Sequence, residues 1–126
     1  SQAVSLCDVL KFQLAEGISF ECSEVSLEQS NLVTRAAMLL KKTTKCDKGV
    51  RIRLRKNIPW GVGLGGGSSD AAATLLTLNK LWGLKLSVSE LARLAFRLGS
   101  NISFFIYGGT ALVEGKGEKV TPLPSL

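Results

Sequence analysis

The feature that most constrains this chain is a run of glycine set between two segments with strong regular patterns. Five of the seven residues from Gly61 to Gly67 are glycine. Glycine loses more conformational freedom on folding than any other residue, so such a density needs a physical reason. A loop that brings backbone N–H groups close to a ligand supplies one, because glycine has no Cβ to hold the ligand away. A tight turn or a flexible linker is the alternative.

The segments on either side of the run favour the ligand-binding interpretation. Val50–Ile58 has the alternation of a strand, and an Ala/Leu-rich pattern predicts a helix from about Ser69 to Trp82. A helix that begins at Ser68 or Ser69 adds unpaired N–H groups and the positive end of its dipole, so phosphate is the expected ligand. The two serines would add hydroxyl donors. Asp70, expected in the first turn, could approach a phosphate-bound magnesium ion.

Two common phosphate-binding motifs do not account for the run. A Walker A loop needs lysine after its last glycine, whereas Gly66 is followed by Gly67 and Ser68. The spacing of Gly61, Gly63 and Gly66 does match the dinucleotide-binding pattern G-x-G-x-x-G. That pattern also requires a strand with an acidic end about 20 residues later, and the sequence offers no convincing one.

The remaining patterns predict a mixed order of strands and helices. Strands are expected over Val4–Leu14 and Ile18–Ser23, and a helix over about Asn31–Thr43, with Ser30 or Asn31 as its cap. The apolar stripe of that helix follows the spacing i, i+3, i+4, i+7 and consists of Val33, Ala36, Ala37 and Leu40.

A further helix is expected over Val88–Leu98, with Ser87 as its cap and Glu90 at the third helical position. Leu91, Leu94, Ala95 and Leu98 mark its apolar face. An apolar run from Ile102 then leads to a predicted strand over Thr110–Glu114. A turn at Gly115–Gly117 and a last strand near Lys119–Leu123 complete the expected order. Strands at both ends with helices between them indicate the α+β class.

Composition narrows the possible chemistry. The chain of 126 residues has 16 Lys and Arg against 10 Asp and Glu, a net charge of +6, which favours anionic partners. Histidine is absent, which excludes Ser-His-Asp and Cys-His catalysis. Three widely spaced cysteines, Cys7, Cys22 and Cys46, indicate neither a disulfide framework nor a zinc site, and reduced thiols point to a cytoplasmic protein. No apolar stretch approaches the roughly 18 residues of a membrane-spanning helix.

Three arginines and Trp60 allow two interpretations each. Arg51, Arg53 and Arg55 alternate along the predicted strand, so one face of the sheet should be basic. That face is either an anion-binding surface or, more ordinarily, a solvated face. Trp60 could stack on a base or cover the loop, and Trp82 is expected in the core.

The segment PWGVGLGGGSSDAA resembles the phosphate loop of the GHMP kinases. SNLVTRAA, LNKLWGL, LARLAFRLGSNISFF and GGTALVEGKGE agree in colinear order. The resemblance implies a fold like domain 2 of ribosomal protein S5, with residues 1–126 as part of an N-terminal ATP-binding domain. It also implies that Asn31 lies near the adenine of ATP, although Asn31 could instead cap a helix. The residues that match the family's ATP phosphate loop are Pro59, Trp60, Gly61, Val62, Gly63, Leu64, Gly65, Gly66, Gly67, Ser68 and Ser69.

The sequence departs from the family pattern in two places. The family's catalytic aspartate lies in a segment like G-A-D-V-P-F-F, which here reads Gly99–Phe105 with Asn101 at the acidic position and Ser103 at the proline. An amide can orient a hydroxyl but cannot accept its proton, so Asn101 marks an altered catalytic position. The alternative interpretation is that Asn101 is an ordinary loop asparagine. The family's lysine-bearing first strand, its R-x-D-G-Y-H-like segment and its second domain are also not found, which predicts a partial domain.

The resemblance implies an ATP- and magnesium-dependent small-molecule kinase. The triple glycine and SSDAA most resemble members that phosphorylate the 2-hydroxyl of 4-diphosphocytidyl-2-C-methyl-D-erythritol in isoprenoid precursor synthesis. The alternatives are a catalytically impaired relative of the same fold and an S5-like module that binds nucleic acid through the basic face. Nucleic acid is the less favoured partner because no recognition helix or base-stacking motif is present. The sequence does not indicate an oligomeric state.

Overall fold

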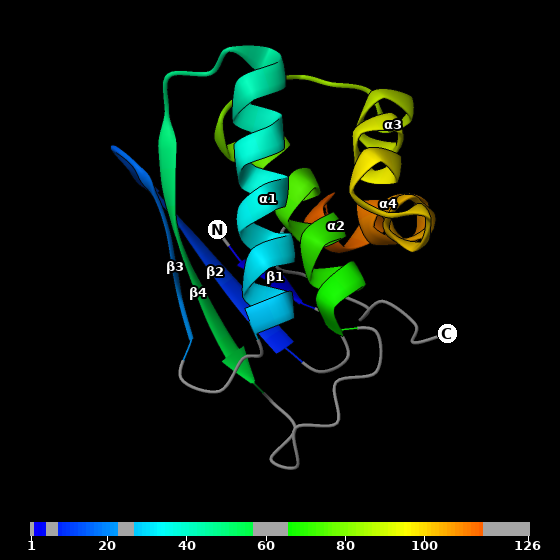
Figure 1. Cartoon of the computed structure of the whole chain (residues 1–126). Helices are drawn as coiled ribbons and strands as arrows, with labels where there is room; N and C mark the ends of the chain where they lie inside the picture. Colours follow the sequence, from blue (N-terminus) through cyan, green and yellow to red (C-terminus); the bar gives the residue numbers. More distant parts are fainter. Residues whose placement is uncertain (1, 5–7, 23–26, 57–65, 115–126) are drawn as a thin grey trace.

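The computed structural model describes residues 2–4, 8–22, 27–56 and 66–114. Four strands form one sheet and four helices pack beside it (Figure 1). In chain order the elements are β1 (Gln2–Val4), β2 (Asp8–Ala15), β3 (Ile18–Glu21), α1 (Leu27–Thr44), β4 (Gly49–Lys56), α2 (Gly66–Leu81), α3 (Val88–Leu98) and α4 (Ser100–Glu114). The α+β prediction is confirmed.

The sheet has the order β1-β2-β4-β3 and mixes both kinds of pairing. β1 and β4 are antiparallel to β2, whereas β3 is parallel to β4. The parallel pair requires a crossover, and α1 supplies it. The pleat turns one face of β4 inward, so that Val50, Ile52 and Leu54 are buried as their alternation predicts.

The short connection from β2 to β3 passes over the beginning of β4, which lies between those two strands. The N–H of Val50 donates to the carbonyl oxygen of Gly17 across 2.9 Å. A Cβ on Gly49 would lie 2.5 Å from the oxygen of Gly17 and 2.6 Å from that of Glu16. Only glycine fits at Gly49 without displacing the backbone, because real Cβ atoms do not approach other atoms so closely.

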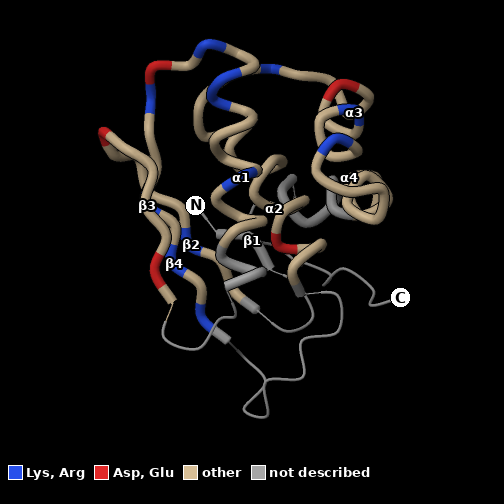
Figure 2. The backbone as a smooth tube through the Cα atoms, viewed as in Figure 1, with Lys and Arg blue, Asp and Glu red and all other residues tan. Residues whose placement is uncertain are grey.

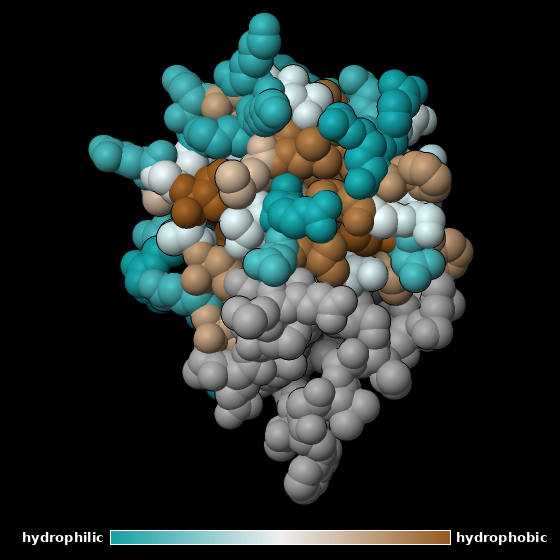
Figure 3. Space-filling model, in the orientation of Figure 1, coloured by the Kyte–Doolittle hydropathy of each residue, from teal (hydrophilic) through white to brown (hydrophobic). Residues whose placement is uncertain are grey.

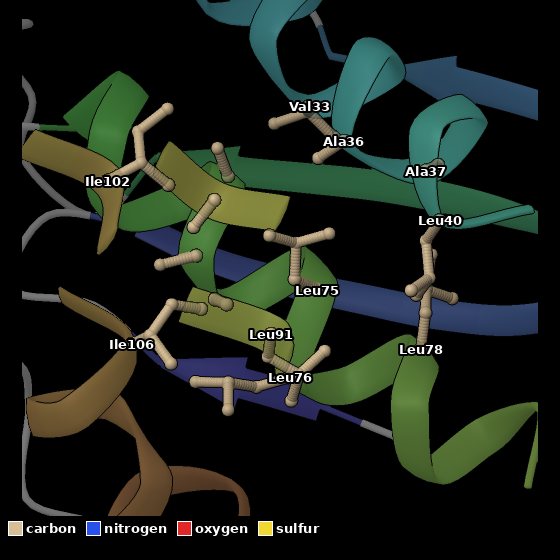
Figure 4. Packing of buried hydrophobic residues seen from close by; sticks show 14 of the residues in the cluster. Val33, Ala36, Ala37, Leu40, Leu75, Leu76, Leu78, Leu91, Ile102 and Ile106 are labelled. Atoms are coloured by element: carbon tan, nitrogen blue, oxygen red, sulfur yellow. The ribbon is translucent and has the colours of Figure 1, made fainter. Parts of the chain in front are cut away.

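The helices form two layers on the inner face of the sheet. α1 and α2 lie against the strands, and α3 and α4 pack on the far side of α2 (Figure 1). Side chains from all four helices meet in one buried cluster, in which Leu40, Leu75, Leu91 and Ile106 are fully or almost fully buried (Figure 4). α2 is therefore the central helix, and its position is set by contacts on all sides.

Trp82 connects this core to the first residue of β4. Its side chain is buried, as expected, and its Nε1–H donates to the carbonyl oxygen of Gly49 across 3.0 Å. The carbonyl oxygen of Trp82 accepts a hydrogen bond of 3.4 Å from Nζ of Lys48. Trp82, the residue after α2, thus fixes the start of β4. Buried tryptophan suits this role because it combines a large apolar area with one N–H donor.

Three predictions about the elements are corrected by the structure. The expected strand Val4–Leu14 is divided between β1, which includes Val4, and β2, which begins at Asp8, and these two strands pair with each other antiparallel. α1 begins at Leu27, so Ser30 and Asn31 lie within the helix and neither caps it. The expected strand Thr110–Glu114 belongs to α4.

The helical course of α4 has a visible cause in its first half. Ile102, Phe105 and Ile106 are buried at the spacing i, i+3, i+4, so tertiary packing of one helical face overrides the strand preference of the residues that follow. The expected turn at Gly115–Gly117 and strand near Lys119–Leu123 lie outside the described residues. None of the helices in the described ranges combines the length and apolar character needed to span a bilayer.

The prediction for α3 is confirmed in its bounds and in its cap. The hydroxyl of Ser87 accepts from the N–H of Glu90 across 3.1 Å, and the N–H of Ser87 donates to Oε1 of Glu90 across 3.0 Å. This capping box satisfies two backbone donors that the helix leaves without partners. The buried face consists of Leu91, Ala92, Leu94 and Ala95.

Replacing Ser87 with alanine is expected to lower the free energy of unfolding by about 1 kcal/mol, because the N–H of Glu90 loses its acceptor. Urea denaturation followed by far-UV circular dichroism measures the change. Ser89→Ala, at an exposed position two residues further on, is the matched control and should change the midpoint little. Equal effects of the two substitutions would contradict the role of the cap.

The same cap should be sensitive to pH. The backbone N–H of Ser87, then its hydroxyl and finally the charge of Arg93 hold the pKa of Glu90 below its ordinary value of 4.5. Because the folded pKa is the lower one, the carboxylate stabilises the fold above pH 4.5 and ceases to do so as the pH falls through the folded pKa. The stability difference between the wild type and Glu90→Gln should therefore vanish in acid; a constant difference would contradict this.

Candidate functional site

The described part of the predicted phosphate site is the beginning of α2. Gly66, Gly67, Ser68 and Ser69 form its first turn, and the N–H groups in the first turn of a helix point away from its internal hydrogen bonds. Gly67 and Ser68 are half-buried and Ser69 is 5% exposed. Because α2 is fixed by the core on all sides, these N–H groups have a set direction before any ligand arrives, which suits an anion.

Asp70 lies deeper than predicted. Since α2 begins at Gly66, Asp70 is its fifth residue and not part of its first turn. It is 0% exposed, and its carbonyl oxygen accepts a hydrogen bond of 2.7 Å from the hydroxyl of the equally buried Thr74. Within the described ranges, no three His, Cys, Asp or Glu side chains are grouped as they would be to hold a metal ion.

The rest of the predicted phosphate loop, Pro59 to Gly65, lies outside the described residues. These are Pro59, Trp60, Gly61, Val62, Gly63, Leu64 and Gly65, and their assignment to an ATP site stays a prediction. The segments on either side are described, however. β4 ends at Lys56 and α2 begins at Gly66, so the run does connect a central strand to a central helix, as the sequence pattern indicates.

Asn31 is an exposed residue in the second turn of α1. α1 and α2 run side by side with their N-terminal ends at the same end of the helical layer (Figure 1). Asn31 and the turn Gly66–Ser69 are therefore placed at one end of the fold, which is what a site for a whole nucleotide requires. Its role near the adenine stays a prediction.

Asn101 is exposed in the first turn of α4, directly before the buried Ile102. It is thus part of a helix rather than of a loop. Ser103, at the family's proline position, donates its hydroxyl to the carbonyl oxygen of Ser100 across 2.9 Å and so closes the first turn without a proline. In the described part of the chain, no hydrogen bond joins Asn101 to Gly66–Asp70, and its catalytic position stays a prediction.

The arginine face of β4 is partly neutralised by its neighbour. Glu21 of β3 lies within 2.9 Å of Arg51 and 3.4 Å of Arg53, and Figure 2 shows the acidic position of β3 beside the basic positions of β4. All three side chains are substantially exposed, so the ion pairs contribute little stability. They favour the ordinary interpretation of a solvated face over that of an anion-binding surface.

Two features of the site region were not predicted from the sequence. The burial of Asp70 follows from the all-round burial of α2, which the density of alanine and leucine from Ala71 to Leu78 signals. The pairing of Glu21 with Arg51 and Arg53 follows from the parallel register of β3 and β4, which has no signal in a single sequence. Cys22 and Cys46 are half-buried free thiols.

Comparison with known proteins places the chain in one family. Residues 31–109 match the family described as the GHMP kinases N terminal domain. A 4-diphosphocytidyl-2-C-methyl-D-erythritol kinase of Geobacillus sp. (strain WCH70) is 54% identical over 78% of this chain and 34% of its own length. A protein of the same name from Nitrosococcus oceani is 49% identical over 97% of this chain and 45% of its own length.

A solved structure gives the same result. A crystal structure of 4-(cytidine 5'-diphospho)-2C-methyl-D-erythritol kinase superposes with a TM-score of 0.66 at 36% identity, covering 97% of this chain and 44% of that one. The chain thus spans less than half the length of each of these relatives. Its mixed sheet, its central helix after a glycine run and these matches establish that the chain belongs to the GHMP kinase family, with most of its length in the N-terminal domain of that fold.

Proposed function

We propose that the chain is the ATP-binding part of a kinase that phosphorylates the 2-hydroxyl of 4-diphosphocytidyl-2-C-methyl-D-erythritol. The observation that carries the proposal is the N-terminal turn of α2, Gly66–Ser69, at the end of a glycine-rich segment that follows a central strand. The names of relatives that are 49% to 54% identical support the choice of substrate. Residues 1–126 would then form part of the N-terminal domain.

The chain's own residues would bind and orient the nucleotide. The N–H groups of Gly66–Ser69 would donate to phosphate oxygens, and the hydroxyls of Ser68 and Ser69 would add donors. Preorganised donors of this kind favour the charge that develops on a transferring phosphoryl group. Asn31, at the same end of the fold, would contact the adenine, which fixes the nucleotide at both ends.

Magnesium fits this arrangement if the phosphates supply most of its ligands. Mg²⁺ commonly binds through one or two carboxylates together with phosphate oxygens and water. Asp70 is the one carboxylate in the first five residues of α2, so it is the candidate protein ligand, although it lies fully buried. The ion would neutralise phosphate charge, and Asp70→Asn should then weaken binding of ATP with magnesium more than binding of ATP alone.

A single-turnover assay with labelled ATP and the diphosphocytidyl substrate tests the function. The full-length protein should transfer phosphate to the 2-hydroxyl, while the 126-residue chain should bind ATP weakly and transfer little. The reason is that these residues do not contain the family's lysine-bearing strand or its R-x-D-G-Y-H-like segment. Robust transfer by the 126-residue chain would contradict the importance of those groups. Failure of the full-length protein to transfer would contradict the substrate.

A further inference from the structure

We propose that a hollow at the C-terminal end of α2 is a second binding site, for a small organic anion with an apolar body, either a carboxylate or a phosphate monoester. Three segments enclose it: the last turn of α1, the connection 82–87 and the exposed face of α3. α2 has 16 residues and is therefore about 24 Å long. The connection 82–87, which lines the hollow, follows the C-terminal end of α2, whereas the turn Gly66–Ser69 lies at the other end of that helix (Figure 1).

The size and lining of the hollow suit a small molecule. Its volume is about 540 Å³, within the roughly 300–1,000 Å³ range of small-molecule sites. Figure 3 shows hydrophobic side chains gathered between α1 and α3, with hydrophilic ones around them. The lining combines three leucines with hydroxyl and charged groups: Thr43, Thr44, Leu84, Leu86, Glu90, Arg93, Leu94 and Arg97.

The wall made by the connection is held in place by Asn79. Its side-chain oxygen accepts from the N–H of Leu86 across 2.9 Å, and its Nδ2 donates to the carbonyl oxygen of Leu86 across 3.1 Å. Its backbone oxygen accepts from the N–H of Leu84 across 3.0 Å. The capping box of Ser87 fixes where α3 begins. The walls of the hollow are therefore ordered before a ligand binds, so binding would cost little free energy for ordering the protein.

The charges around the hollow select an anion. Arg93 and Arg97 are four residues apart on α3, so their side chains share one helical face. Both are exposed, and neither forms an ion pair with any residue of the described ranges. The one carboxylate in the lining, Glu90, accepts the N–H of Ser87 and is attracted by the charge of Arg93. The two guanidinium groups still outnumber it, and their planar forks fit a carboxylate or a phosphate.

Nuclear magnetic resonance titration of the 126-residue chain tests this site. Phenylacetate and phenyl phosphate are the probes, and inorganic phosphate is the probe without an apolar body. Both phenyl compounds should shift amide signals of residues 43–44, 84–86 and 90–97, and the tighter of the two identifies the preferred anion. Inorganic phosphate should bind at least tenfold more weakly. Equal binding by inorganic phosphate at residues 43–44, 84–86 and 90–97, or no shifts of these residues with either phenyl compound, would overturn the proposal. Shifts at residues 61–70 would report the proposed nucleotide site and not this one.

Matched variants separate the site from general attraction of anions. Arg97→Gln should weaken phenyl phosphate binding about tenfold or more, whereas Arg35→Gln removes the same charge from an exposed position of α1 outside the hollow and should leave it unchanged. Thr43→Phe, at an exposed position of the lining, should block binding without loss of charge. If Arg35→Gln weakens binding as much as Arg97→Gln, or if Thr43→Phe binds like the wild type, the hollow is not the site.

Discussion

Replacing Gly49 with alanine is expected to lower the free energy of unfolding by about 3 kcal/mol, near the upper end of the usual cost of overpacking. The added Cβ would lie 2.5 to 2.7 Å from backbone atoms of Glu16 and Gly17. Those atoms cannot simply move away, because the carbonyl oxygen of Gly17 accepts the N–H of Val50 and the carbonyl oxygen of Gly49 accepts Nε1–H of Trp82. Denaturant unfolding monitored by Trp fluorescence measures the loss.

Gly17→Ala is the matched control for this prediction. It lies in the same connection, but a Cβ there would meet nothing within 4 Å, and its backbone is outside the left-handed region. A surface change of this kind should alter stability by no more than about 0.5 kcal/mol. The two variants therefore differ in whether the added Cβ meets another backbone segment. Equal stability of Gly49→Ala and Gly17→Ala would contradict the close approach of Glu16 and Gly17 to Gly49.

The second large effect concerns the reaction. Changing Asn101 to aspartate in the full-length protein is expected to raise the rate of phosphate transfer by about 10²–10⁴, the usual contribution of a positioned general base. The exposed position of Asn101 in the first turn of α4 leaves room for the change, and its buried neighbour Ile102 keeps the turn in place. Single-turnover rates with saturating ATP give the measurement.

The conservative control for Asn101→Asp is Asn101→Ser, which can orient a hydroxyl but is not a base at neutral pH. If aspartate accepts the proton, only Asn101→Asp should gain rate, and the gain should disappear in acid as the new carboxylate becomes protonated. A rate unchanged by aspartate would remove base catalysis from the proposed function. A gain equal in both variants would assign the effect to orientation alone.

The elements that the sequence predicted well are those whose information is local. The helix Val88–Leu98 has an apolar period and a capping box within four residues, and the alternation of Val50, Ile52 and Leu54 indicates one buried face of a strand. Both signals depend on neighbours in the chain, so a single sequence contains them.

The elements that the sequence did not predict depend on tertiary contacts. The separation of β1 from β2, the course of α4 through Thr110–Glu114 and the close approach at Gly49 are each decided by segments distant in the chain. The same holds for the site. Its glycine run and serines are recognisable as a motif, whereas the burial of Asp70 results from the helices packed around α2.

The most direct test of the central claim is to map where ATP binds on the 126-residue chain. In a magnetic resonance titration with ATP and magnesium, the largest amide shifts should fall on residues 61–70, and AMP, which lacks the β- and γ-phosphates, should cause much smaller ones. Binding that leaves the signals of residues 66–70 unchanged at saturating ATP, with shifts concentrated elsewhere, would contradict the claim that the start of α2 holds the triphosphate.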